Sequence, residues 1–167
     1  LLRGLFSADI PKVAHDVKDM TYALLERGLP ADGFLFDTAL AAYLLDATAG
    51  GYDLQRLFVA YCGAELPAPV HLARDAFAPL SDTATEEAAL CSYTSAVSAL
   101  YEILPDKLEE LNLTALLHEM ELPLCRVLAE MELAGFRIDE CALAQFGIDL
   151  HERIVKLEQS IYDMAGE

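Results

Sequence analysis

Hydrophobic residues recur at helical spacing along most of the chain. The longest such pattern lies within Leu113 to Asp139, where apolar residues return every three or four positions and therefore share one side of a helix. This predicted apolar face consists of Leu113, Leu116, Leu117, Met120, Leu124, Val127, Leu128 and Met131. Because Pro123 lacks a backbone N–H, we expect the helix to kink at 121–123 or to restart there with Pro123 in its first turn.

A second helical pattern closes the chain. Gly135 can end the preceding helix in a left-handed conformation, and residues 136–138 alternate like a short strand. Asp139 is then the predicted N-cap of a helix from Glu140 to Ala165. Its apolar residues recur at the same steps: Leu143, Phe146, Leu150, Ile154, Leu157, Ile161 and Met164. This stripe needs a partner, so we expect the chain to be a fragment of a longer protein.

The polar side of the last helix offers pairs of opposite charge one turn apart. Asp149 with Arg153, and Glu152 with Lys156, have the spacing of exposed ion pairs.

The first half of the chain alternates short extended runs with helices. Extended runs are predicted at 12–16 and 34–36, and a helix at 17–27 that Gly28 ends. Asp37 lies where a helix N-cap belongs, and Asp53 caps a further helix that ends at Gly63.

A loop and a long helix follow. Residues 64–80 contain three prolines and little periodicity, which is typical of a loop. Ser81 or Asp82 is expected to open the next helix, which is predicted from Thr85 to Leu104 with Ala89, Tyr93, Val97, Leu100, Tyr101 and Leu104 on one face. We place a domain boundary at Pro105 and Asp106.

Composition narrows the class of protein. Hydrophobic residues make up 54% of the 167 residues, which suffices for a buried core, and charges interrupt every window that could form a membrane span. The N-terminus does not resemble a secretion signal, so a cytoplasmic location is expected. The net charge is −17, from 28 acidic and 11 basic residues, and neither half is basic. A nucleic-acid-binding surface needs an excess of Lys and Arg to neutralise phosphates, so weak or no DNA binding is expected from this chain alone.

Cysteine and histidine residues are scattered. Cys62, Cys91, Cys125 and Cys141 lack zinc-ligand spacing and are interpreted as reduced, small apolar residues. The histidines are interpreted as ordinary surface or half-buried side chains: His15, His71, His118 and His151.

Four stretches in order resemble the bacterial DNA polymerase I family, also called family A. KVAHDVKDMTYALLERGL resembles a family segment of the form K-V-G-Q-N-hydrophobic-K-Y-D, and FLFDTALAAYLLDATAGGYDLQRLFVAYCG resembles the run F-D-T-M-L-A-S-Y-L-L that follows it. MELPLCRVLAEMELAGFRID is similar to I-E-x-P-L-x-x-V-L-A-x-M-E-x-x-G, and the closing AGE to A-G-E-x-F-N. The resemblance covers nearly the whole chain.

This resemblance implies an α+β, predominantly α fold. Residues 1–108 would be the C-terminal part of a 3′–5′ exonuclease-like domain with a ribonuclease H-like fold, and residues 109–167 the first helices of the polymerase domain at the base of the thumb. The parent would be a DNA-directed DNA polymerase of replication and repair. Its partners would be a DNA template-primer and dNTPs, and its cofactor Mg²⁺.

The family's exonuclease acids are not matched. The Asp-x-Glu of the opening strand would precede Leu1, and the acid of K-Y-D falls on Met20, with Asp19 one position early and so about 100° away around a helix. No acid occurs between Glu87 and Glu102, where a further ligand is expected. We therefore predict no catalytic, cofactor-binding or metal-binding residue here, and a catalytically inert segment.

Alternatives remain open at this point. Asp16, Asp19 and Asp37 could form a relocated metal site of a working metal-dependent 3′–5′ exonuclease, although surface acids of an acidic chain and a helix cap at Asp37 are the favoured interpretation. The chain could instead be an acidic helical protein-interaction module. Its exposed apolar faces also leave self-association open.

Overall fold

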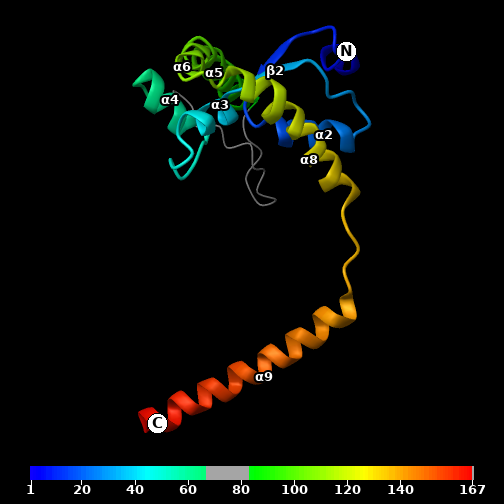
Figure 1. Cartoon of the computed structure of the whole chain (residues 1–167), viewed down its shortest axis with the longest axis vertical. Helices are drawn as coiled ribbons and strands as arrows, with labels where there is room; N and C mark the ends of the chain where they lie inside the picture. The colour runs from blue at the N-terminus through cyan, green and yellow to red at the C-terminus, as the bar shows by residue number, and fades with distance from the viewer. Residues whose placement is uncertain (67–82, 167) are drawn as a thin grey trace. The chain divides into compact units, whose positions relative to one another are not determined.

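The computed structural model describes residues 1–66 and 83–166 and is mostly helical, with one small sheet. It forms two compact units, Leu1–Ala134 and Gly135–Glu167 (Figure 1). The predicted α+β, predominantly α class is confirmed. These units reflect compactness and do not test the expected domain boundary after residue 108, which stays a prediction.

A β–α–β unit forms the first part of the chain. After a short helix that was not predicted, α1 (Leu2–Leu5), strand β1 (Lys12–Ala14) leads into helix α2 (Val17–Glu26) and strand β2 (Phe34–Asp37). The strands pair in parallel, with Ala14 opposite Asp37. Both extended runs and the helix between them are therefore confirmed, although β1 ends before residue 16.

The turn before β2 requires a glycine. Gly33 has φ +76°, and a Cβ there would lie 2.6 Å from the carbonyl oxygen of Ile10. Any other residue would be strained and would displace the backbone.

Four helices build the main core. They are α3 (Thr38–Leu45), α4 (Leu54–Cys62), α5 (Thr83–Tyr101) and α6 (Leu104–Glu110). The core of buried residues comprises Phe36, Ala41, Ala42, Leu54, Leu57, Leu66, Ala96, Val97, Leu100, Leu104, Leu108 and Leu117. The loop expected at 64–80 and the helix start at Ser81 or Asp82 lie largely outside the described residues.

The single helix predicted over 85–104 is wrong at its end. Helix α5 stops at Tyr101, and Leu104 begins α6 with Pro105 in the first turn. A proline is tolerated there because the first N–H groups of a helix have no intrahelical acceptor. Tyr101 is also 39% exposed and so does not belong to the buried face.

The helix predicted within residues 113–139 contains a π-helical turn directly before Leu122, and Pro123 lies in the first turn of the α-helix that follows, as predicted. Helix α7 (Thr114–Leu116) continues into a π-helical turn (Leu117–Glu121) and then into α8 (Leu122–Ala134). Helices α2 and α8 pack side by side (Figure 1).

The predicted apolar face is confirmed at Leu117, which is fully buried, and is wrong from Met120 onward. Beyond that point Cys125 and Ala129 are buried, whereas the predicted side chains are 39–63% exposed: Met120, Leu124, Val127, Leu128 and Met131. Two physical reasons account for this. Small side chains allow α8 to approach α2 closely, and the π turn adds a residue, which rotates the following side chains by about 100° relative to a continuous α-helix.

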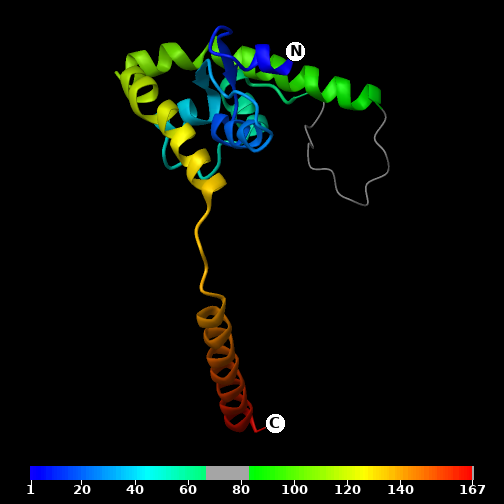
Figure 2. The same ribbon diagram turned by 90° about the vertical axis from the view of Figure 1, so that its right-hand side faces the viewer.

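The second unit contains one helix. Gly135 has φ +62° and ends α8, as predicted. Residues 136–138 form no strand, because a strand needs a neighbour and the two strands of the described residues pair with each other. Helix α9 (Glu140–Ala165), shown in Figure 2, has the predicted bounds. The Asp139 carboxylate caps it by accepting a hydrogen bond from Ala142 N at 3.0 Å.

The ion pairs predicted along α9 do not form in the described part of the chain. Asp149 instead accepts a hydrogen bond from Gln145, and Asp163 from Gln159, each at 2.8 Å. Both pairs have the expected spacing of one helical turn, but they join an amide to a carboxylate.

Candidate functional site

Asp37 is a buried carboxylate in the unit Leu1–Ala134. It is 1% exposed and lies at the end of β2, directly before α3. One oxygen accepts from Ala39 N at 2.8 Å and Leu40 N at 3.4 Å, which confirms the predicted cap of α3.

The same carboxylate also caps α2, which lies earlier in the chain. Asp37 Oδ2 accepts from Val17 N at 2.7 Å, and Oδ1 from Asp16 N at 3.2 Å. Asp16 itself has φ 57° and makes no side-chain cap bond. Both oxygens of Asp37 are therefore occupied by backbone N–H groups at two helix starts. This second role was missed because its donors lie about twenty residues away in sequence.

Burial dominates the electrostatics of this carboxylate. Desolvation raises the pKa of Asp37 above its ordinary value, although the hydrogen bonds from the backbone N–H groups of Val17, Ala39 and Leu40 and the nearby His15 act in the opposite direction.

A buried histidine lies beside the double cap. His15 is 6% exposed, its Nδ1 is 2.8 Å from Thr38 Oγ1, and its Nε2 is 3.5 Å from the Asp16 carboxylate. The Tyr93 hydroxyl donates to the His15 carbonyl oxygen at 3.3 Å, and burial raises the pKa of this tyrosine. His15 is thus more buried than predicted, because it fixes the β1–α2 turn against α3 and α5. His118 and His151 are exposed, as expected, and His71 lies outside the described residues.

Asp19, which belonged to the alternative of a relocated metal site, points to solvent. The Asp19 side chain is 71% exposed and lies 3.1 Å from Lys18. Met20, the position matched to the family's second acid, packs against the apolar cluster of Ala14, Val17 and Cys125. In residues 1–66 and 83–166, no group of three His, Cys, Asp or Glu side chains could hold a metal ion. The donor set therefore does not fit a two-metal centre, since Asp37 is already saturated and Asp19 is paired with a lysine.

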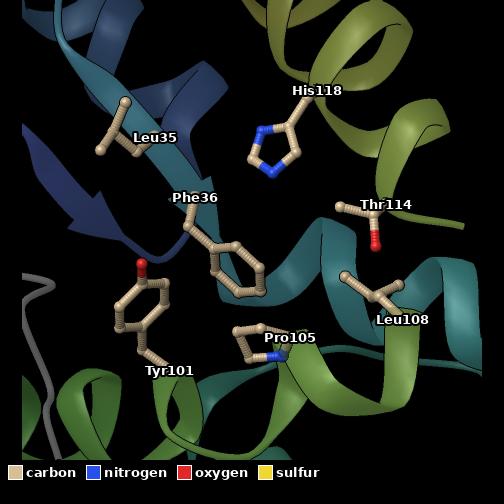
Figure 3. Close-up of a pocket in the computed structure, with 7 residues that line it drawn as sticks. All are labelled: Leu35, Phe36, Tyr101, Pro105, Leu108, Thr114 and His118. Atoms are coloured by element: carbon tan, nitrogen blue, oxygen red, sulfur yellow. The ribbon is translucent and has the colours of Figure 1, made fainter. Parts of the chain in front are cut away.

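Two hollows flank the edge of β2. One, of about 190 Å³, is lined by Leu35, Phe36, Tyr101, Pro105, Leu108, Thr114 and His118. Figure 3 shows these side chains converging from β2, α5, α6, α7 and the π turn. This hollow is smaller than common ligand pockets, and its lining is mainly apolar.

The second hollow, of about 360 Å³, lies between α2 and α8. It contains Cys125, whose pKa burial raises to about 11, and the ion pair of Arg126 with Asp32 at 2.9 Å. Neither feature supplies a nucleophile or an acid–base pair.

Ion pairs join α8 to the β–α–β unit across the predicted domain boundary. Lys18 Nζ donates to the Glu132 carboxylate at 2.6 Å, and this hydrogen bond, with that to Asp19, raises the pKa of the lysine. The partners of this pair are 114 residues apart in sequence, so no local pattern predicts it. This ion pair and that of Arg126 with Asp32 hold α8 against the β–α–β unit.

Comparison with known proteins gives the family. No protein-family model matches the chain. It is 30% identical to DNA polymerase I of Caldicellulosiruptor bescii over 168 residues, covering the whole chain, and 33% identical to DNA polymerase I of Geobacillus stearothermophilus over 158 residues, covering 93% of it. The chain belongs to the DNA polymerase I family. It spans 18% of the length of each of these DNA polymerase I relatives.

A solved structure supports the same assignment. The polymerase domain of Pol1 from M. smegmatis, in complex with DNA primer-template and dNTP, superposes with a TM-score of 0.73 at 30% identity. The match covers 98% of this chain and 26% of that chain. The resemblance to DNA polymerase I found in the sequence is thereby confirmed. In the described part of the chain, no helix is both long and apolar enough to cross a membrane.

Proposed function

We propose that this chain is a segment of a bacterial DNA-directed DNA polymerase. The parent would extend a primer on a DNA template from dNTPs, in replication and repair, in the cytoplasm. The observation that carries this proposal is the identity of 30–34% to DNA polymerase I over nearly the whole chain. The M. smegmatis neighbour, whose structure contains primer-template and dNTP, supports the same partners.

Within that parent, residues 1–108 would be a ribonuclease H-like, 3′–5′ exonuclease-like scaffold without nuclease activity. Three features support this role. Asp37 holds two helix starts, and Met20 packs in an apolar cluster. The family's Tyr-x-x-x-Asp element is expected near residues 90–100, where Val97, four residues after Tyr93, is buried in the main core. Met20, the position matched to a family metal ligand, and Asp37, an acid of the alternative relocated metal site, would thus both serve the fold.

Residues 109–167 would begin the polymerase domain and carry no residue of nucleotidyl transfer. The sequence contains neither of the acidic motifs expected to hold the catalytic metal, which resemble D-Y-S-Q-I-E and V-H-D-E. Mg²⁺ would supply charge stabilisation to the transferred phosphoryl group in the parent, outside this segment. The 167-residue chain by itself is expected to be inert.

Primer extension tests the proposal. The parent protein should extend a 5′-labelled primer on a template when dNTPs and Mg²⁺ are present, and EDTA should abolish the reaction. The 167-residue chain, as the control, should neither extend the primer nor shift its fluorescence anisotropy at physiological salt. A parent protein that extends no primer would overturn the proposed function.

A further inference from the structure

The side-chain ammonium of Lys12, the first residue of β1, is held by neutral backbone groups. Its Nζ donates to three carbonyl oxygens, those of Leu5 at 3.0 Å, Ser7 at 2.9 Å and Ile10 at 2.5 Å. An ammonium group has three N–H donors and no acceptor, so these oxygens satisfy every donor. Among the described residues, no carboxylate lies within ion-pair distance of Lys12. The carbonyl oxygens alone therefore bind this charge through hydrogen bonds.

Two aromatic rings complete a cage around the same ammonium. Lys12 Nζ lies 6.0 Å from the ring centroid of Phe6 and 5.7 Å from that of Phe34. A cation within about 6 Å of a ring centroid is attracted by the ring face. The centroids of the two rings are 6.4 Å apart. Because Phe34 is the first residue of β2, the cage joins the residues before β1 to the second strand.

Backbone contacts around the cage link the same two segments. Lys12 N donates to the Gly33 carbonyl oxygen at 2.8 Å, and Asp32 N donates to the Phe6 carbonyl oxygen at 3.1 Å. Gly33 forms one wall of the cage, because a Cβ there would lie 2.8 Å from Lys12 Nζ. The ammonium thus lies where residues 5–10 are fastened to the turn before β2.

We infer that residues 5–10 and Phe34 form a binding site for a primary ammonium ion, and that Lys12 is its resident, intramolecular ligand. The donor set selects this class of ligand. Three convergent carbonyl oxygens match the three N–H groups of a primary ammonium, whereas a quaternary ammonium could contact the rings but has no N–H to donate. Lys12 is only half-buried, so a small ion can reach the site once this side chain is shortened. The inference does not depend on the proposed function.

Chemical rescue in the parent protein tests this site. Lys12→Ala removes three methylene groups and the ammonium, which are the atoms that n-propylammonium would restore. Amide hydrogen exchange of peptides covering residues 2–12 and 29–34, followed by mass spectrometry, should become several-fold faster in this variant, because the segment before β1 loses its fastening. Addition of n-propylammonium chloride should restore the slow exchange. Neither tetramethylammonium chloride, which has no N–H, nor n-propanol, which has no charge, should do so.

Two further variants separate the cage from a general loss of stability. Lys12→Met keeps an apolar stem in the cage without the ammonium, so its exchange should be faster and n-propylammonium should not rescue it. Lys107→Ala is the matched control, because the Lys107 ammonium lies 5.9 Å from a single ring, that of Tyr61. This control should leave the exchange of residues 2–12 unchanged.

Acetylation of the unmodified parent provides a test that requires no variant to fold. Lys12 should be acetylated several-fold more slowly than the exposed Lys107, because its three N–H donors are occupied. Equal acetylation of the two lysines would overturn the inference. Exchange that Lys12→Ala does not change would also overturn it, as would rescue by tetramethylammonium or n-propanol, or by potassium chloride in place of n-propylammonium.

Discussion

Replacing the double helix cap tests how the N-terminal unit is held together. In the Asp37→Ala variant, the backbone N–H groups of Asp16, Val17, Ala39 and Leu40 lose their carboxylate acceptor. A lost N-cap costs about 1–2 kcal/mol, and a carboxylate that serves two helices should cost about 2–4 kcal/mol. Burial makes the loss larger, because water does not reach the freed donors of a side chain that is 1% exposed.

Urea unfolding of the 167-residue chain, followed by circular dichroism, measures this loss. The midpoint of the Asp37→Ala variant should fall by about 1–2 M if the slope is near 2 kcal/mol per M. Asp53→Ala is the matched control, because Asp53 is an exposed cap with a single bond, to Arg56 N at 3.0 Å. The control should lose only about 0.5–1 kcal/mol. Equal losses in the two variants would refute the double cap.

Four further predictions concern burial, packing and ionisation. Alkylation mapped by mass spectrometry should modify the exposed Cys141 well before Cys125, which is buried and has a pKa of about 11, and equal rates would contradict the assigned burial. Ala129→Leu should destabilise the chain by about 1–3 kcal/mol in urea unfolding, because Ala129 is fully buried between α8 and α2. Lys18→Met should cost at most about 1 kcal/mol, since its ion pair with Glu132 is partly exposed, and a larger loss than that of Ala129→Leu would contradict this packing. Because the pKa of Asp37 is raised from 3.8, its carboxyl contributes a stability that is present below pH 3.8 and is lost as pH rises through the folded value. As the pH rises from below 3.8 through the folded pKa of Asp37, the urea midpoint of the unmodified chain should fall relative to that of the Asp37→Asn variant. A midpoint of the unmodified chain that rises relative to that of the variant would contradict the raised pKa.

Features encoded by neighbouring residues could be predicted from the sequence. The caps at Asp37, Asp53 and Asp139 were predictable because each carboxylate bonds an N–H two or three residues ahead. The bounds of α9 follow from a cap at one end and Gly166, with φ +80°, at the other. These signals depend on local backbone geometry alone.

Features that depend on distant partners could not be predicted in this way. The second role of Asp37 requires that α2 return to the end of β2, and the Lys18–Glu132 pair joins residues 114 positions apart. The buried face of α8 was predicted wrongly because periodicity ranks large apolar side chains above small ones. Contact with α2 instead selects Cys125 and Ala129, which permit a close approach.

The most direct test of the scaffold role is a degradation assay on the parent polymerase. Single-stranded DNA labelled at its 5′ end would be incubated with the parent and Mg²⁺ or Mn²⁺, without dNTPs, and the Asp37→Asn variant would be run in parallel. The labelled strand should stay intact with both proteins, because Asp37 is expected to bind backbone N–H groups and no metal. A metal-dependent ladder of shortened strands that disappears in the Asp37→Asn variant would contradict it.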